Sequence, residues 1–264
     1  MSLQLDDELI QFAGTLADAA RQVAGGYFRN LTAVWSKTDR SPVTVADIEI
    51  EKLLRSMIHE RFPGHGVLGE EGGHDESTGP WLWVIDPIDG TKSFATGKPT
   101  FGCLVALLHQ GHPMLGIIDM PALDERWLGV TGQDALYNGI RCCTSNTQEL
   151  TAASVYATTP DMFSAAELKI FDHLTSHARF RNFGADCYAY ALLASGYVDL
   201  VMEAGLGQFD FLALAPVVEG AGGSISDWQG ERLSFDSQGQ VLASANQELH
   251  NQALDLIAAQ VAGT

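Results

Sequence analysis

The sequence is short of positive charge. Its 264 residues include 15 Lys and Arg against 33 Asp and Glu, which gives a formal net charge of -18 at pH 7. A surface of this kind repels nucleic-acid backbones, and the chain has no run of basic residues that would form a local binding patch. We therefore expect no nucleic-acid partner, and an anionic substrate would need a metal ion or a helix terminus as its counter-charge.

Long apolar runs are also lacking. No stretch reaches the length of about 20 apolar residues that spans a bilayer. The first seven residues have neither the basic start nor the apolar run of a signal peptide. We therefore expect a cytoplasmic protein without a membrane partner.

Cysteine is scarce. The four cysteines (Cys103, Cys142, Cys143 and Cys187) show no Cys-x-x-Cys spacing. The neighbours Cys142 and Cys143 point to opposite faces if they lie in a strand. We expect reduced thiols that fill space, and we do not expect a zinc site.

The strongest local pattern is the stretch Trp-Val-Ile-Asp-Pro-Ile-Asp-Gly-Thr at residues 83–91. Its apolar start predicts a buried strand, and we expect Pro87 to end this strand because proline has no N–H for a sheet ladder. The turn then directs Asp86 and Asp89 into one small volume. A hard cation such as Mg²⁺, which takes oxygen ligands, would relieve the repulsion between them.

Two amphipathic helices are predicted before this stretch. Apolar residues recur at three- and four-residue steps over residues 3–29 and again over residues 44–61. Within the second helix, Asp47 and Glu51 fall on the more polar side. A Phe-Pro-Gly sequence then ends that helix.

The remainder of the first half is rich in β-type runs. Residues 101–108 and 114–120 predict a hairpin, and residues 126–130 and 135–142 continue as strands. We therefore expect residues 1–147 to form an α+β unit with two helices on a mainly antiparallel sheet.

Residues 143–152 turn polar, and we expect a second unit at residues 148–264. Its apolar β-type runs alternate with helical segments, which predicts a mixed α/β half with helices flanking a mixed or parallel sheet. The predicted strands are 154–158, 179–183, 198–203 and 223–227, and the predicted helices are 164–176, 186–195, 210–221 and 246–261.

Six acidic residues stand at predicted turns or element ends, where functional carboxylates and ordinary helix caps both occur. Taken alone, each is explained as a cap or a solvated surface charge. Their grouping in neighbouring motifs favours a shared site instead. The six are Asp47, Glu70, Glu71, Asp86, Asp89 and Asp210.

The acidic motifs together resemble the inositol monophosphatase family of metal-dependent phosphatases. Gly-Glu-Glu-Gly-Gly at 69–73 precedes Asp-Pro-Ile-Asp-Gly-Thr at 86–91, and Asp210 precedes the glycine-rich segment 220–223. This order covers nearly the whole chain, and the six-residue motif is specific in its strand-turn context. The resemblance implies a layered α-β-α-β-α sandwich (α+β and α/β in class), a small phosphomonoester substrate and a homodimer.

The resemblance also implies two or three Mg²⁺ ions per site. The matching ligands are Glu70, Asp86, the main-chain oxygen of Ile88, Asp89 and Asp210. Gly90 and Thr91 match the phosphate-binding turn, where N–H groups at a helix start face the anion.

Asp47 and Thr91 match the pair that positions a metal-activated water for in-line attack on phosphorus, and Glu70 joins them as a catalytic residue. Lys37 aligns less closely with a basic residue of a flexible loop. Glu71 is expected to support the metal site without binding the ions.

Two segments depart from the inositol pattern and are similar to the histidinol-phosphate phosphatase branch of the same family. They are Gly-Ala-Asp-Cys-Tyr-Ala-Tyr at 184–190, and residues 118–121 together with Glu-Arg-Trp at 125–127. Asp186 adds a carboxylate to an already acidic pocket, and Glu203 matches a substrate-contacting position. A substrate with an ammonium or imidazolium group would compensate both charges. The alternative is that Asp186 only caps the helix that begins there.

These observations predict hydrolysis of L-histidinol phosphate, a step of histidine biosynthesis, with Asp186, Glu203, Asp210, Gly90 and Thr91 binding the substrate. One alternative is an inositol-1-monophosphatase or a related sugar or nucleotide phosphatase. A second, of another class, is a regulatory protein that keeps the fold and binds another protein. The intact set of carboxylates argues against it.

Overall fold

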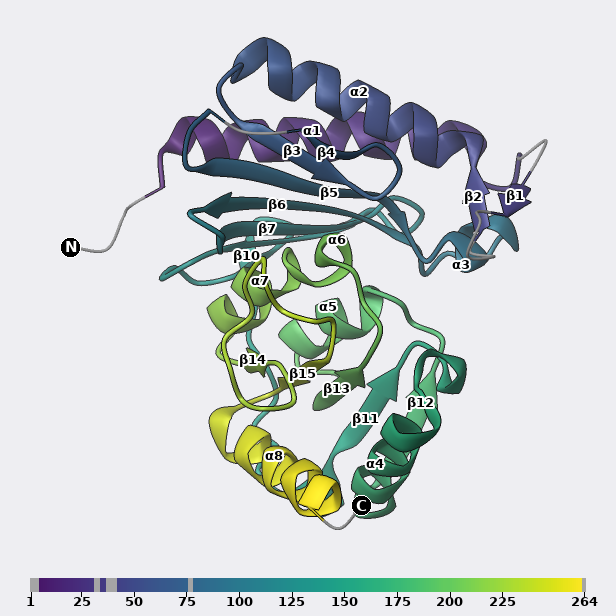
Figure 1. Cartoon of the computed structure of the whole chain (residues 1–264), viewed down its shortest axis with the longest axis vertical. Helices are drawn as coiled ribbons and strands as arrows, with labels where there is room; N and C mark the ends of the chain where they lie inside the picture. Colours follow the sequence, from purple (N-terminus) through teal and green to yellow (C-terminus); the bar gives the residue numbers. More distant parts are fainter. Residues whose placement is uncertain (1–4, 31–33, 37–41, 76–77, 263–264) are drawn as a thin grey trace.

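Two long helices form the outer layer of the protein. In the computed structural model, α1 (Asp7–Tyr27) and α2 (Val45–Arg61) lie on one face of a large sheet (Figure 1). Both occur where amphipathic helices were predicted. The residues that the structure describes are 5–30, 34–36, 42–75 and 78–262. Lys37 lies outside them, so its role stays a prediction.

The buried face of α2 differs from the predicted one. Asp47 and Glu51, predicted on the polar side, are 0% and 2% exposed, whereas Ile48 from the predicted apolar stripe is 51% exposed. The prediction was wrong because both acids have hydrogen-bond partners at their buried positions. Asp47 caps the helix start at Thr44, and Glu51 accepts hydrogen bonds from a neighbouring loop. Apolar periodicity does not detect buried acids that are paired in this way.

The large sheet has eight strands in the order β10-β9-β8-β7-β6-β5-β3-β4, and neighbours are antiparallel except for β3 and β5. The predicted hairpin forms between β6 and β7. A separate two-stranded sheet pairs β1 (Val34–Ser36) with β2 (Pro42–Thr44). The strands of the large sheet are β3 (Gly66–Gly69), β4 (Gly73–Asp75), β5 (Trp81–Asp89), β6 (Gly102–His109), β7 (His112–Met120), β8 (Glu125–Val130), β9 (Leu136–Tyr137) and β10 (Ile140–Arg141).

Strand β5 does not end at Pro87, as was predicted, but continues to Asp89. Asp86 still pairs with Leu104, and Asp89 pairs with Gly102 after a register shift. Pro87 lies inside this irregular segment, for which no ladder pair is formed. The strand therefore bulges around the proline, and both aspartates stay at the end of the sheet.

The second sheet has five strands in the order β12-β11-β13-β15-β14. Strands β12, β11 and β13 run parallel, and β13, β15 and β14 are antiparallel, so the predicted mixed sheet is present. We did not predict β15. The strands are β11 (Ser154–Ala157), β12 (Phe180–Phe183), β13 (Leu200–Glu203), β14 (Ser224–Ser226) and β15 (Val241–Ser244).

The helices of the second half complete a five-layer arrangement (Figure 1). Helices α5, α6 and α7 lie between the two sheets, and α4 and α8 cover the outer face of the second sheet. This is the predicted layered sandwich. The predicted helix at 210–221 is divided in two, and the helices are α4 (Ala165–Ser176), α5 (Tyr188–Ala194), α6 (Gln208–Phe211), α7 (Leu214–Gly220) and α8 (Gln247–Ala262). A division of the chain into units at 147 and 148 stays a prediction.

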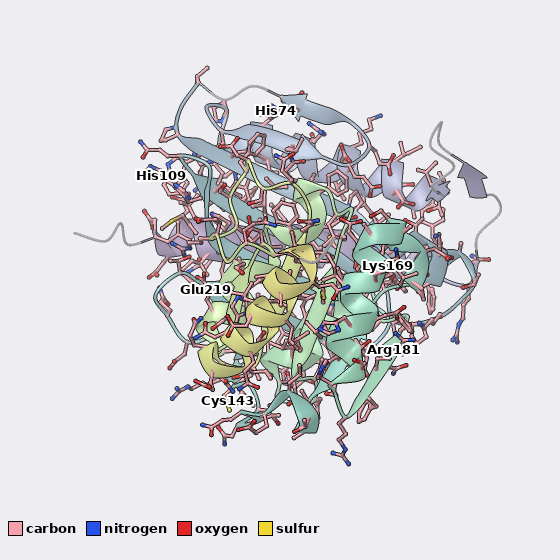
Figure 2. All side chains as sticks on the ribbon, turned by 60° about the horizontal axis from the view of Figure 1, so that its bottom comes forward. His74, His109, Cys143, Lys169, Arg181 and Glu219 are labelled. Atoms are coloured by element: carbon pink, nitrogen blue, oxygen red, sulfur yellow. The ribbon has the colours of Figure 1, made fainter. Side chains whose placement is uncertain are left out.

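The cysteines are unpaired, and the helices were compared with the requirements for crossing a membrane. All four cysteines are free; Cys103 and Cys187 are buried, and Cys143 is exposed at the periphery of the molecule (Figure 2). Among the helices that the structure describes, none combines the length and the apolar character needed to cross a bilayer.

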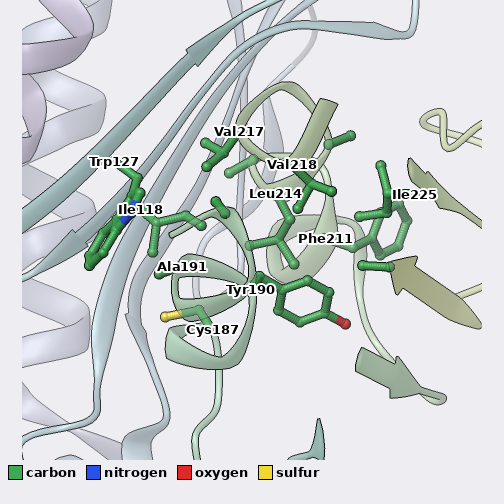
Figure 3. Packing of buried hydrophobic residues seen from close by; sticks show 14 of the residues in the cluster. Ile118, Trp127, Cys187, Tyr190, Ala191, Phe211, Leu214, Val217, Val218 and Ile225 are labelled. Atoms are coloured by element: carbon green, nitrogen blue, oxygen red, sulfur yellow. The ribbon is translucent and has the colours of Figure 1, made fainter. Parts of the chain in front are cut away.

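The middle layer packs tightly on the large sheet (Figure 3). Phe211, Leu214 and Val217 join Trp127 in one buried cluster. The main chain between α6 and α7 comes so close to β7 that a Cβ atom on Gly116 would lie 1.8 Å from the carbonyl oxygen of Ala213. This close approach holds the segment after Asp210 against the sheet that carries Asp86 and Asp89.

We predict that Gly116→Ala lowers the free energy of unfolding by about 1–3 kcal/mol, because the added methyl group overpacks the contact between β7 and the middle layer. Gly14→Ala is the matched control, since nothing lies within 4 Å of a Cβ atom there. In a helix this change should raise stability by about 0.5–1 kcal/mol. Urea unfolding of both variants tests the prediction, and equal effects would contradict it.

Candidate active site

Three carboxylates meet where the bulged end of β5 faces α6. Asp86 and Asp89 stand on either side of the register shift in β5, and Asp210 lies in α6. One carboxylate oxygen of each lies within 4.8 Å of the others. The structure therefore brings together three of the predicted metal ligands from segments that are far apart in the sequence.

Main-chain N–H groups orient these three carboxylates. Each carboxylate accepts one such hydrogen bond, which fixes its direction without adding a positively charged side chain. The donors are Ile88 N–H to Asp86 (3.0 Å), Cys187 N–H to Asp89 (2.6 Å) and Gly207 N–H to Asp210 (2.6 Å).

Burial and neighbouring negative charges raise the pKa of all three carboxyl groups. Burial is the largest cause in each case, and the charge of Glu70 raises the pKa of Asp86 and Asp210 further. The pKa of Asp210 rises from 3.8 to about 7, and that of Asp89 rises with the charge of Asp186 as a second cause. In the absence of a cation, the site therefore resists full ionisation near neutral pH.

Asp47 points a further carboxylate at the same region. Its Oδ2 atom accepts hydrogen bonds from the N–H and the hydroxyl of Thr44, at 2.8 Å for the N–H. Its Oδ1 atom is buried and has no hydrogen-bond partner among the described residues. Burial raises the pKa of Asp47, and the charge of Glu70 adds to the increase.

A divalent cation fits this donor set. Among the described residues, the buried, unpartnered Oδ1 atom of Asp47 and the crowded oxygens of Asp86, Asp89 and Asp210 form no ion pair, and hard cations such as Mg²⁺ prefer such oxygen ligands. Glu70 lies close enough for its charge to act on Asp47, Asp86 and Asp210. Its role as a ligand, and that of the Ile88 oxygen, stay predictions.

The predicted phosphate-binding turn directly follows β5. Gly90 adopts a left-handed conformation (φ 81°) at the start of the short helix α3 (Thr91–Ala95). The Thr91 hydroxyl donates to the main-chain oxygen of Ile88 at 3.2 Å. A Cβ atom on Gly90 would lie 2.9 Å from the carboxylate of Asp186, so this position also requires a residue without a side chain.

A pocket of about 190 Å³ connects the metal region to the predicted specificity residues. Asp89 and Asp210 line it together with Asp186 and Glu203. Within the described part of the chain, no side chain caps α5, so Asp186 is not a helix cap. Its φ of 51° instead directs the carboxylate toward Ser93, whose hydroxyl donates to it at 2.7 Å.

Glu203 is 2% exposed and held by two donors. The Thr158 N–H donates to it at 2.6 Å and the Tyr190 hydroxyl at 2.9 Å. The Tyr190 ring packs in the cluster with Phe211 and Leu214 while its hydroxyl points out of that cluster (Figure 3). Burial raises the pKa of Glu203, and the two hydrogen bonds oppose this effect.

Sequence reasoning missed the residues that hold the predicted site in place. Ser93, Thr158 and Tyr190 orient Asp186 and Glu203, and Glu51 contacts the loop that carries Glu70. Only Glu51 had a usable signal, because it follows Asp47 by four residues and so shares its helix face.

Comparisons with known proteins agree with this geometry. A family model described as the inositol monophosphatase family matches residues 5–262. The chain belongs to this family. Its members are metal-dependent phosphatases, and the chain is accordingly a metal-dependent phosphatase acting on small phosphomonoesters.

The relatives in this family carry several names. The chloroplastic bifunctional phosphatase IMPL2 of Arabidopsis thaliana is 45% identical over 95% of this chain and 76% of its own length. A histidinol-phosphatase of Chlorobaculum parvum is 36% identical over 90% of this chain and 92% of its own length. An inositol monophosphatase structure from Zymomonas mobilis has a TM-score of 0.88 and 38% identity, and the match covers 97% of this chain and all of that one.

We predict that the metal-free protein depends on the protonation of Asp210 for stability. A raised pKa in the folded state contributes stability that is present at low pH and is lost as the pH rises from 3.8 through about 7. The free energy of unfolding of Asp210→Asn minus that of the wild type, measured by urea unfolding in chelator, should therefore increase over this range.

The same pair of proteins supplies the control. Saturating Mg²⁺ should stabilise the wild type above neutral pH and stabilise Asp210→Asn less, because a ligand that binds only the folded state raises its stability. A difference between the two proteins that does not change with pH in chelator would contradict the assignment.

Proposed function

We propose that the protein hydrolyses L-histidinol phosphate to L-histidinol and phosphate. The observation that carries the proposal is that one pocket contains Asp186 and Glu203 beside the metal-region residues Asp89 and Asp210. Histidinol carries an amine and an imidazole, and two extra carboxylates give these groups partners that a neutral polyol does not need.

The electrostatics of Glu203 support this substrate. The carboxylate is buried, its pKa is raised by that burial, and its direction is fixed by Thr158 and Tyr190. A cationic group in the pocket would favour the ionised form and offset the cost of burying the charge. Preorganised acceptors of this kind bind an ammonium or imidazolium without a further loss of side-chain freedom.

Asp186 is held in a different way. Ser93 donates to its carboxylate, and the charges of Lys98 and Lys92 lower its pKa against the effect of burial. Asp186 also lies against Gly90, at the start of the predicted phosphate-binding turn. We infer that Asp186 contacts the part of the substrate next to the phosphate and that Glu203 contacts a group farther along the pocket.

The catalytic roles follow from the same arrangement. Mg²⁺ held by Glu70, Asp86, Asp89, Asp210 and the Ile88 oxygen would lower the pKa of a water molecule and stabilise the leaving oxygen. The Asp47 carboxylate and the Thr91 hydroxyl would orient that water, and the Asp47 carboxylate would accept its proton. The N–H groups of Gly90 and Thr91 bind the phosphate.

A related inositol or sugar-phosphate phosphatase is the second candidate. Its specific support is the 38% identity to the inositol monophosphatase structure from Zymomonas mobilis. The two candidates share the metal site and differ in whether the leaving group is cationic or neutral. The homodimer and the cytoplasmic location stay predictions, and neither candidate function depends on them.

We predict that Asp186→Asn and Glu203→Gln each raise the KM for histidinol phosphate about 10- to 150-fold. This range corresponds to the loss of about 1.5–3 kcal/mol from a hydrogen bond to a charged group. Hydrolysis of inositol 1-phosphate should change little in both variants, because its hydroxyl groups carry no charge. Steady-state phosphate release with saturating Mg²⁺ measures both.

The matched control is Asp161→Asn, which removes an exposed acid from the adjacent short helix η2 (Pro160–Met162). This change should leave the KM for histidinol phosphate and the hydrolysis of inositol 1-phosphate unchanged. An unchanged KM for histidinol phosphate in Asp186→Asn and Glu203→Gln would overturn the proposal, and a wild-type preference for inositol 1-phosphate would favour the second candidate.

A further inference from the structure

Glu51 lies one helical turn after Asp47 on the buried face of α2, and it has no place in the chemistry described above. Its carboxylate accepts three hydrogen bonds. The N–H of Glu71 donates to Oε2 at 2.7 Å, and the N–H of Gly72 donates to Oε1 at 2.6 Å. The Arg55 Nε atom donates to Oε1 at 2.8 Å.

The glycines of the Gly-Glu-Glu-Gly-Gly motif are required by this contact. A Cβ atom on Gly69 would lie 2.4 Å from the Glu51 carboxyl carbon, and one on Gly72 would lie 2.5 Å from Oε1. Gly69 and Gly72 thus allow the loop to close around the carboxylate on both sides of Glu70. The motif therefore has two functions. Glu70 faces the site, and Gly69 and Gly72 leave space for the Glu51 carboxylate.

Arg55 connects the same carboxylate to the hairpin beyond the loop. It forms an ion pair with Glu51, donates to Asp75 at 2.7 Å and donates to the main-chain oxygen of Gly73. The charge of Glu51 is therefore compensated by the guanidinium of Arg55, which is half-buried. Because this carboxylate already has a cationic partner, Glu51 is suited to hold the loop and not to bind a further cation.

We propose that Glu51 is a positioning residue that fixes the 69–73 loop so that Glu70 reaches the metal site. Helix α2 then contributes to the site twice, through Asp47 directly and through Glu51 by way of the loop. The proposal rests on the predicted role of Glu70 as a ligand. It does not depend on which phosphate ester is the substrate.

The test measures Mg²⁺ binding by calorimetry in the absence of substrate. Replacing a group that supports a metal ligand typically weakens metal affinity about 10- to 100-fold, and we expect Glu51→Gln to do so. Glu51→Asp keeps the charge but is too short to reach both N–H groups, so it should also weaken binding. At saturating Mg²⁺, the kcat of both variants should return close to that of the wild type.

A second variant perturbs the contact without removing Glu51. In Gly72→Ala the added methyl group pushes the carboxylate away from the loop, and Mg²⁺ affinity should fall. Gly14→Ala, where nothing lies within 4 Å, is its control. Ile58→Val, a buried change on the same helix, should lower the melting temperature and leave Mg²⁺ affinity unchanged.

The outcomes separate the possible failures. Wild-type Mg²⁺ affinity in folded Glu51→Gln, or in Glu51→Asp, would overturn the positioning role, and the latter would show that charge alone suffices. Glu70→Gln is measured alongside: if it binds Mg²⁺ as the wild type does, Glu70 is not a ligand and the premise fails. A failure of the histidinol phosphate proposal would leave all these values unchanged.

Discussion

The repulsion among three crowded carboxylates, one buried and two half-buried, is the constraint on which the rest of the structure depends. Asp86, Asp89 and Asp210 lie within 4.8 Å of one another, and burial prevents water from screening them. Such a cluster is unfavourable by itself, and it persists because the surrounding fold holds it. The bulge around Pro87 places two of the acids, and the close packing of the middle layer on Gly116 places the third.

In the proposed function, different parts of the fold supply the chemistry and select the substrate. The end of β5, the turn at Gly90, helix α2 and Asp210 of α6 provide the groups expected to act on any phosphate ester, whereas Asp186 and Glu203 are expected to select the substrate. Neutral donors such as Ser93 and the Tyr190 hydroxyl orient these two carboxylates without neutralising them. In the proposed function, the two carboxylates thereby stay available to a positively charged leaving group.

The sequence predicted the features that depend on neighbouring residues and missed those that depend on residues far apart in the chain. Asp86 and Asp89 were identifiable because a strand and a turn lie next to them in the chain. The hairpin of β6 and β7 was identifiable because its two strands are adjacent in the sequence. Glu51 was predicted on the more polar side of its helix because its partners, the N–H groups of Glu71 and Gly72, lie in a later loop. The contact between Tyr190 and Glu203 could not be predicted, because it depends on packing between layers.

We infer that the acidic cluster is partly protonated in the metal-free protein and ionises when a cation binds. Calorimetric titration of the metal-free protein with Mg²⁺ near pH 7, in two buffers of different ionisation enthalpy, counts the protons released on binding. Because the pKa of Asp210 is about 7 and those of Asp86 and Asp89 are also raised, the account predicts net proton release. Binding of Mg²⁺ without any proton release would contradict it.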